Sequence, residues 1–237
     1  MCIRDRPYTA WFWNERYKMR NLRGETVYPG AYRRVIIREE NLKQRGLQTD
    51  FDWLEVRQLK GRDFIAIEKL RMGDRAWLAP WEAGAPPGLG HPVSIDEFVK
   101  DAAHTARLGQ GMYFGIIAEG RLAGQISLSS VHRGAEMSAA LGYWINSRFA
   151  GRGLTPLALA MVIDWGFASY GLHRLEVNIR PENSPSLRVV EKLGLRYEGL
   201  RQRFLYIDGA WRDHSSFAIT TEEWHPGSTV AGLETAR

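Results

Sequence analysis

The chain has 237 residues, of which 44% are hydrophobic and 25% charged, a composition that supports a sizeable core and excludes wholesale disorder. Its net charge of +5 is compatible with a polyanionic neighbour such as RNA, but ordinary surface charge explains so modest a value equally well. The one cysteine, Cys2, excludes an intramolecular disulfide and a cysteine-based zinc site, and no apolar run approaches the roughly 20 residues that span a bilayer. We therefore expect a cytoplasmic protein without a metal site.

Residues 1–52 are interpreted as an N-terminal extension whose order the sequence does not determine. Aromatic residues stand there among Arg and Lys without a regular period, at Tyr8, Trp11, Phe12, Trp13 and Tyr17. Such a mixture can stack on single-stranded nucleic acid, which leaves proximity to RNA or the ribosome open. The alternative is a loosely ordered extension, partly foreign to the domain, since residues 1–6 resemble a leader. A strand over 32–38 and a helical turn over 39–45 are the elements expected within it.

The ordered domain is expected to begin near Trp53. Apolar spacing predicts a strand from there to about Leu59 and a helix over 62–72. A loop rich in Gly and Pro follows, and then Ser94 and Glu97 form the capping-box pattern that opens a second helix. Further strands are predicted over 112–118 and 122–128, which form a hairpin, and over 137–145, 174–179, 197–207 and 211–219.

A glycine loop follows the strand that ends at Ile145. Gly151 and Gly153 stand one residue apart, and Thr155 and Pro156 suit the start of a helix, Thr155 as its cap. Apolar side chains then recur with the 3.6-residue period of a helix packed on a sheet. The segment therefore reads as strand, glycine loop and helix.

The loop has the physical properties of a phosphate site, although a tight strand-to-helix turn would give the same pattern. Two glycines let the backbone turn without a Cβ that would hold a ligand away. N–H groups converge at the positive end of the helix dipole, where Arg148 and Arg152 add cationic side chains. No Lys-Ser/Thr follows the last glycine, which excludes a P-loop, and no acidic residue is placed as a Rossmann fingerprint requires.

A second segment makes the interpretation specific. The strand over 174–179 leads into Asn-x-x-Ser, with Asn183 and Ser186, and then into a short helix over 187–193. Together with Arg-x-x-Gly-x-Gly at 148–153, this segment resembles the two acetyl-CoA segments of the GNAT N-acetyltransferase superfamily. The resemblance covers about residues 54–224.

The resemblance implies an α/β fold with a mixed sheet, splayed between the strands that flank the glycine loop and flanked by helices on both faces. It places the acetyltransferase domain at 53–225 and leaves 226–237 as a flexible tail.

Two further stretches resemble the RimJ-type ribosomal-protein-alanine N-acetyltransferases within that superfamily. One is Leu-Ala-Pro-Trp-Glu at 78–82, and the other is the predicted C-terminal hairpin with Asp-Gly-Ala-Trp-Arg-Asp-His at 208–214. The implied activity is acetyl transfer from acetyl-CoA to the N-terminal amine of a ribosomal protein, typically an alanine. Two alternatives stay open: acetylation of a small amine such as an aminoglycoside or a polyamine, and a non-catalytic module that binds acyl-CoA or RNA.

The resemblance also implies which residues hold acetyl-CoA. The expected cofactor contacts come from the aromatic strand, the glycine loop and the Asn-x-x-Ser segment, namely Tyr143, Trp144, Ile145, Arg148, Gly151, Arg152, Gly153, Leu154, Thr155, Asn183 and Ser186. Backbone N–H groups near Trp144 and Ile145 are expected to hold the pantetheine arm and to polarise the thioester carbonyl. Asn183 either bonds the cofactor arm or caps a turn or helix. Trp77, Trp81 and Glu82 form the expected substrate wall, with core packing as the alternative for the two tryptophans.

The chemistry requires an amine that loses a proton and a thiolate that gains one. Ser186 matches the position of a general acid in related enzymes, with helix capping as its alternative role. The candidates for a base that acts through a water are Glu82, Glu176 and Glu136, each of which is otherwise an ordinary solvated carboxylate. Asp213 and His214 are expected to make structural hydrogen bonds rather than a catalytic dyad.

Overall fold

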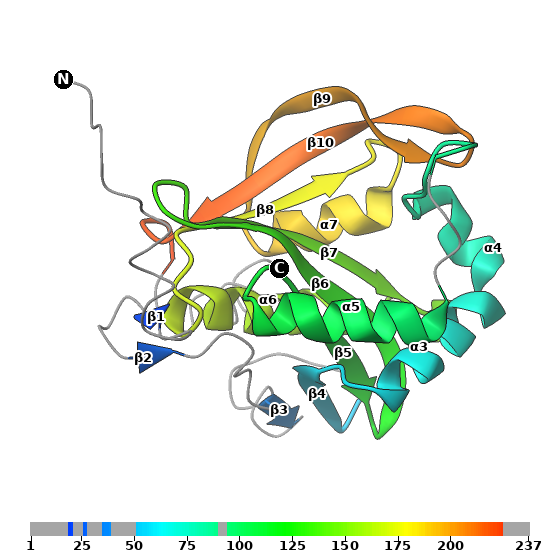
Figure 1. Cartoon of the computed structure of the whole chain (residues 1–237), viewed down its shortest axis with the longest axis horizontal. Helices are drawn as coiled ribbons and strands as arrows, with labels where there is room; N and C mark the ends of the chain where they lie inside the picture. The colour runs from blue at the N-terminus through cyan, green and yellow to red at the C-terminus, as the bar shows by residue number, and fades with distance from the viewer. Residues whose placement is uncertain (1–18, 21–25, 28–34, 39–50, 90–93, 225–237) are drawn as a thin grey trace.

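The computed structural model describes residues 19–20, 26–27, 35–38, 51–89 and 94–224. An eight-stranded mixed sheet runs through it in the order β3-β4-β5-β6-β7-β8-β10-β9, with β3 and β4 at one end and the β9–β10 hairpin at the other (Figure 1). Its strands are β3 (Val35–Arg38), β4 (Trp53–Gln58), β5 (Met112–Ala118), β6 (Arg121–His132), β7 (Ser138–Ile145), β8 (Arg174–Ile179), β9 (Arg196–Ile207) and β10 (Ala210–Thr220). A separate two-stranded sheet pairs β1 (Met19–Arg20) with β2 (Thr26–Val27).

The helices begin where the sequence signals indicate. Ser94 caps α5, and its capping box with Glu97 is complete, as predicted. The helices are α3 (Arg62–Gly73), α4 (Arg75–Leu78), α5 (Ile95–Arg107), α6 (Leu154–Ala168) and α7 (Ser184–Lys192), with short 3-10 turns η1 (Ala79–Trp81) and η2 (Ser147–Phe149). Two starts differ from the prediction: α6 begins at Leu154, before its predicted cap Thr155, and α7 begins at Ser184 rather than at Leu187, because Asn183 caps it.

Alternation along β5 shows how helices cover both faces of the sheet. Phe114 packs its ring on Trp165 of α6, with ring centroids 5.4 Å apart. The neighbouring Tyr113 points to the opposite face and contacts Phe64 of α3 and Phe98 of α5. Successive side chains of a strand point to opposite faces, so α6 lies on one face and α3 with α5 on the other. The predicted mixed sheet with flanking helices is confirmed.

The parallel pair β7 and β8 separates along its length. The two strands pair only at Ser138–Ala140 opposite Arg174–Glu176. Beyond these residues β7 continues to Ile145 along β6, while β8 continues to Ile179 along β10. The splay expected between the strands on either side of the glycine loop is therefore present, and it opens toward the end of β7 that carries the loop.

The sheet extends further toward the N-terminus than the domain start expected at Trp53. β3 pairs antiparallel with β4, Val35 opposite Val56 and Arg38 opposite Trp53. The predicted strand over 32–38 is thus found at Val35–Arg38. The helical turn expected over 39–45, the aromatic cluster between Tyr8 and Tyr17, and the tail at 226–237 lie outside the described residues. Within the described part of the chain, no helix has the length and apolar character required to cross a membrane.

Candidate active site

A cleft of about 500 Å³ lies where β7 and β8 separate, bordered by the glycine loop, the N-terminus of α6 and the first turns of α7. It brings together most of the predicted site residues from four separate segments of the chain. Those that line it are Trp77, Trp81, Tyr143, Trp144, Ile145, Gly151, Arg152, Gly153, Leu154, Thr155, Asn183 and Ser186.

The glycine loop turns as its sequence predicts. Gly151 and Gly153 both have positive φ, 79° and 74°, a conformation that costs an L residue about 1–2 kcal/mol. No side chain caps α6, since Gly153 occupies the N-cap position and Thr155 is the second helical residue. The predicted capping role of Thr155 is therefore wrong. The first-turn N–H groups of a helix have no intrahelical partner, and here they border the cleft.

The register of β7 determines which backbone groups face the opening. The N–H of Asn146 donates to the carbonyl of Ala123 at 2.8 Å. Asn146 and Ala123 are therefore a hydrogen-bonded pair in the ladder that joins β7 to β6. Bonded and non-bonded pairs alternate in an antiparallel ladder. The backbone groups of Trp144 therefore point to β6, and those of Tyr143 and Ile145 point into the opening. Of the two N–H groups expected to polarise a carbonyl, that of Ile145 points into the opening, whereas that of Trp144 points to β6. The N–H of Tyr143, one residue earlier, also points into the opening.

Tyr143 and Ser186 form a hydroxyl pair inside the cleft. The Ser186 hydroxyl donates to the Tyr143 oxygen at 2.8 Å, and the Tyr143 hydroxyl lies 3.1 Å from the Ser186 carbonyl, to which it donates. Asn183, not Ser186, caps α7, because its Oδ1 accepts from the Ser186 N–H at 3.2 Å. Burial raises the pKa of the Tyr143 phenol well above its usual range, so the hydroxyl keeps its proton at neutral pH.

The segment from Asp74 to Trp77 is tied to the end of β7. The Asp74 carboxylate accepts from the Ser147 N–H at 2.6 Å and from the Ser147 hydroxyl at 2.8 Å. The Trp77 indole N–H donates to the Ile145 carbonyl at 3.0 Å. These contacts hold α4 against the cleft, and they assign Trp77 to its wall rather than to the core.

Trp81, the tryptophan of η1, is held in place by Arg180. The Arg180 guanidinium lies 5.4 Å from the ring centroid of Trp81 and donates to the Pro80 carbonyl at 2.7 Å. The chain beyond η1 continues onto the hairpin, where Ala83 forms a bridge with Ile207. Of the predicted substrate wall, Trp81 is therefore held by the residue that follows β8, and the chain just after it by the end of β9.

The three candidate bases do not line the cleft. Glu82 is ion-paired with Arg71, and Glu176 is bound by Arg174 at 2.8 Å and by Arg201 at 2.9 Å. Glu136 precedes β7, at the end of the strand remote from the cleft, and accepts from the Ser138 hydroxyl. Among the described residues that line the cleft there is no Asp or Glu.

Asp213 and His214 do not form a catalytic pair. The Asp213 carboxylate accepts from the Arg203 N–H at 2.7 Å, and His214 Nδ1 lies 3.0 Å from the Arg212 carbonyl. Burial lowers the pKa of His214, which keeps the ring neutral. Both side chains make structural hydrogen bonds within the hairpin, as predicted: Asp213 bonds across to β9 and His214 within β10.

The charged groups of the cleft are cationic. Arg152 lines it and also pairs with Glu119 at 3.3 Å, whereas Arg148 is exposed on η2 and does not line it. Two further cations, Arg188 and Lys192, line the cleft, although they are not among the site residues predicted from the sequence. Their spacing of four residues in a predicted helix places them on one face, and that signal would have found them.

The chain matches the model of the acetyltransferase (GNAT) domain over residues 54–196, more than half of its length. It belongs to the GNAT acetyltransferase family. The match contains the whole cleft, including the glycine loop and the hydroxyl pair.

Individual GNAT relatives agree with this assignment. The chain is 32% identical over 185 residues to the ribosomal protein uS5-alanine N-acetyltransferase of Escherichia coli K12, covering 74% of this chain and 92% of the relative. The solved structure of Mycobacterium smegmatis RimJ in complex with CoA-disulfide superposes with a TM-score of 0.75 at 33% identity, covering 88% of this chain and 97% of that one. Similarity also extends to the spermidine N(1)-acetyltransferase of E. coli K12, at 27% identity over 49% of this chain and 65% of the relative.

Proposed function

We propose that the protein transfers the acetyl group of acetyl-CoA to a protein N-terminal amine, foremost the N-terminal alanine of a ribosomal protein, in the cytoplasm. The observation that carries the proposal is one cleft that combines a glycine loop at a helix N-terminus, open β7 backbone groups and the Tyr143–Ser186 hydroxyl pair. The similarity to the E. coli alanine acetyltransferase and to the CoA-bound RimJ structure supports the donor and the acceptor class.

The residues of the cleft suit the successive parts of acetyl-CoA. The loop from Gly151 to Gly153 and the α6 N-terminus suit the diphosphate, since their N–H groups and the helix dipole favour an anion. Arg188 and Lys192 add positive charge for the remaining phosphate. The N–H groups of Tyr143 and Ile145 and the carbonyl of Tyr143, which point into the opening, suit the amides of the pantetheine arm. Asn183 keeps its NH2 group for this arm, since its Oδ1 caps α7.

The hydroxyl pair suits the departing sulfur. The amine nitrogen bonds to the thioester carbon, the carbon–sulfur bond breaks, and the proton lost by nitrogen ends on sulfur. Open N–H groups of β7 stabilise the oxyanion that forms on the carbonyl oxygen. We assign to Tyr143 and Ser186 the donation of a hydrogen bond to the thiolate and the relay of its proton.

Among the described residues no Asp or Glu lines the cleft, which favours a protein N-terminus over a polyamine as acceptor. A polycation would be attracted by carboxylates, whereas the charged residues lining this cleft are Arg152, Arg188 and Lys192. An N-terminal amine also needs little help from a base, because its ordinary pKa is about 7.7–8.0. The small-amine alternative is therefore the less favoured candidate.

A matched acceptor panel tests the proposal. The purified full chain is mixed with acetyl-CoA and an Ala-starting ribosomal peptide, the same peptide with a blocked N-terminus, spermidine or an aminoglycoside, and thiol release and product mass are followed. We expect acetylation of the free peptide alone. Activity confined to spermidine or the aminoglycoside would refute the proposed acceptor class. Binding of acetyl-CoA without turnover on any of the amines would refute the proposed enzymatic activity.

The pH dependence should follow the acceptor rather than an enzyme carboxylate. We expect kcat/KM to rise with pH to a plateau, with a midpoint near the pKa of the acceptor amine at about 8. An acceptor with a more basic amine should move the midpoint upward with it. Glu82→Gln and Glu176→Gln should keep the wild-type midpoint, and its loss in either variant would identify that carboxylate as the base.

Removing the Asp74 carboxylate should weaken use of acetyl-CoA, because Ser147 begins the turn that leads into the glycine loop. For Asp74→Asn we expect the KM for acetyl-CoA to rise roughly 3- to 10-fold with little change in kcat. This is the change in affinity expected for the loss of one exposed charge-assisted hydrogen bond. Asp96→Asn, at an exposed position at the start of α5, is the matched control. Initial rates at saturating acceptor measure both constants, and an unchanged KM would contradict the coupling.

A further inference from the structure

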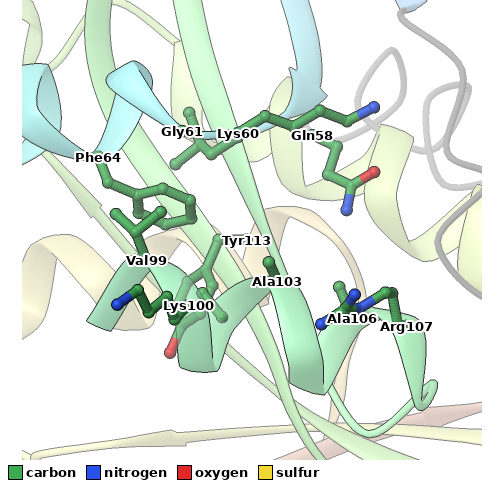
Figure 2. A pocket seen from close by; sticks show the side chains of 12 residues that line it. Gln58, Lys60, Gly61, Phe64, Val99, Lys100, Ala103, Ala106, Arg107 and Tyr113 are labelled. Atoms are coloured by element: carbon green, nitrogen blue, oxygen red, sulfur yellow. The ribbon is translucent and has the colours of Figure 1, made fainter. Parts of the chain in front are cut away.

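A second cavity, of about 510 Å³, lies on the face of the sheet that carries α3 and α5 and shares no lining residue with the cofactor cleft. Its floor is apolar, formed by Leu59, Phe64 and Tyr113. On the α5 side, three lining residues are alanines, Ala102, Ala103 and Ala106. Their short side chains leave space between α5 and the loop before α3 (Figure 2).

The charged residues that line this cavity are all cationic. Lys60, Lys100 and Arg107 line it, and no Asp or Glu does among the described residues. Other described cations are ion-paired, as Arg57 is with Asp63 at 2.7 Å and Arg201 with Glu176 at 2.9 Å. Within the described part of the chain the ion pairs include none that involves Lys60, Lys100 or Arg107. Such a site favours an anion.

The wall also includes the amide side chain of Gln58. Its Oε1 atom is buried and has no hydrogen-bond partner in the described structure. Because this atom has no accessible surface, a molecule in the cavity does not reach it, and the amide adds only polarity to the wall. Gln58 ends β4, and Figure 2 shows it beside Lys60 and across the cavity from Arg107 on α5.

The two ends of the cavity differ in chemistry. Gln58, Lys60 and Arg107 lie toward one end, while Phe64 and Val99 lie toward the other, with Lys100 beside Val99 (Figure 2). Arg binds a carboxylate through two parallel hydrogen bonds, which suits the polar end. The volume lies in the range of small-molecule sites.

We propose that this cavity binds a small carboxylic acid that has an apolar body. The carboxylate lies between Lys60 and Arg107, and the apolar body covers Phe64 and Val99. The site is independent of acetyl transfer, since its residues and those of the cleft are different sets.

N-acetyl-L-phenylalanine is a suitable probe, because it carries a carboxylate and an apolar ring. Titration of the full chain, followed by calorimetry with CoA present, should give saturable binding. The methyl ester of the probe, which lacks the charge, should not bind. Arg107→Glu and Ala103→Trp should each weaken binding by about tenfold or more, as expected for losing a charge-assisted contact or filling the space.

Lys69→Glu, a charge reversal on an exposed residue of α3 outside the cavity, is the matched control and should bind the probe as the wild type does. Four results would each overturn the proposal: the probe does not bind, the methyl ester binds equally well, CoA displaces the probe, or both cavity variants bind the probe as the wild type does. Because the readout is binding with CoA already present, the result does not depend on which amine the enzyme acetylates.

Discussion

Gly151→Glu should abolish acetyl-CoA binding while the domain stays folded. The residue has φ of 79°, and no atom lies within 4 Å of the position that a Cβ would occupy. A glutamate therefore fits sterically but places a carboxylate beside the proposed diphosphate position. Two like charges about 4 Å apart at an effective dielectric constant near 20 repel by about 4 kcal/mol. We expect the Kd for acetyl-CoA, measured by calorimetry, to rise by roughly 100-fold or more.

Two controls separate charge from backbone strain. Gly151→Gln has the same side-chain length and the same positive-φ strain, so it should lose similar stability but bind acetyl-CoA far better than the glutamate variant. Gly134→Glu puts the same residue at φ of 77° in an open turn before β7, remote from the cleft, and should bind as the wild type does. Unchanged affinity in Gly151→Glu would refute the assignment of the loop to phosphate.

Local signals explain why much of this fold could be predicted from the sequence. The Ser94–Glu97 box starts α5 because both of its hydrogen bonds form within four residues. Gly151 and Gly153 mark their turn because few other residues tolerate their backbone angles. In such cases the sequence carries both partners of the interaction, so the structure confirms the element and its start within a residue or two.

The remaining features depend on partners far apart in the chain. Glu82 looks free in the sequence, yet Arg71 neutralises it from α3. Glu176 looks like a base on a strand, yet Arg201 reaches it from a hairpin 25 residues later. The capping of α7 by Asn183 frees the Ser186 hydroxyl, but its bond to Tyr143 spans 43 residues and follows only from the splay of β7 and β8. Sequence patterns place residues on elements, whereas tertiary packing decides which charges stay available.

Removing either hydroxyl of the cleft should cost most of the turnover. For Ser186→Ala and Tyr143→Phe we expect kcat to fall by roughly 10- to 1,000-fold, the effect of losing one proton-transfer group, with the Kd for acetyl-CoA nearly unchanged. Because burial raises the pKa of Tyr143, its ionisation should not limit the rate through neutral and mildly alkaline pH. Single-turnover rates with a saturating Ala-starting peptide measure the chemical step. Ser184→Ala, on the exposed first residue of α7, is the matched control and should keep the wild-type kcat.

The double variant decides whether the two hydroxyls act together. The Ser186 hydroxyl donates to the Tyr143 oxygen at 2.8 Å, so a relay loses its function when either member is removed. In that case Tyr143→Phe combined with Ser186→Ala should be no slower than the worse single variant, because groups that act as a unit are strongly non-additive. Effects that multiply would instead show two independent roles. A wild-type kcat in both single variants would leave the pair a packing contact between β7 and α7, and the proton would then reach sulfur through solvent.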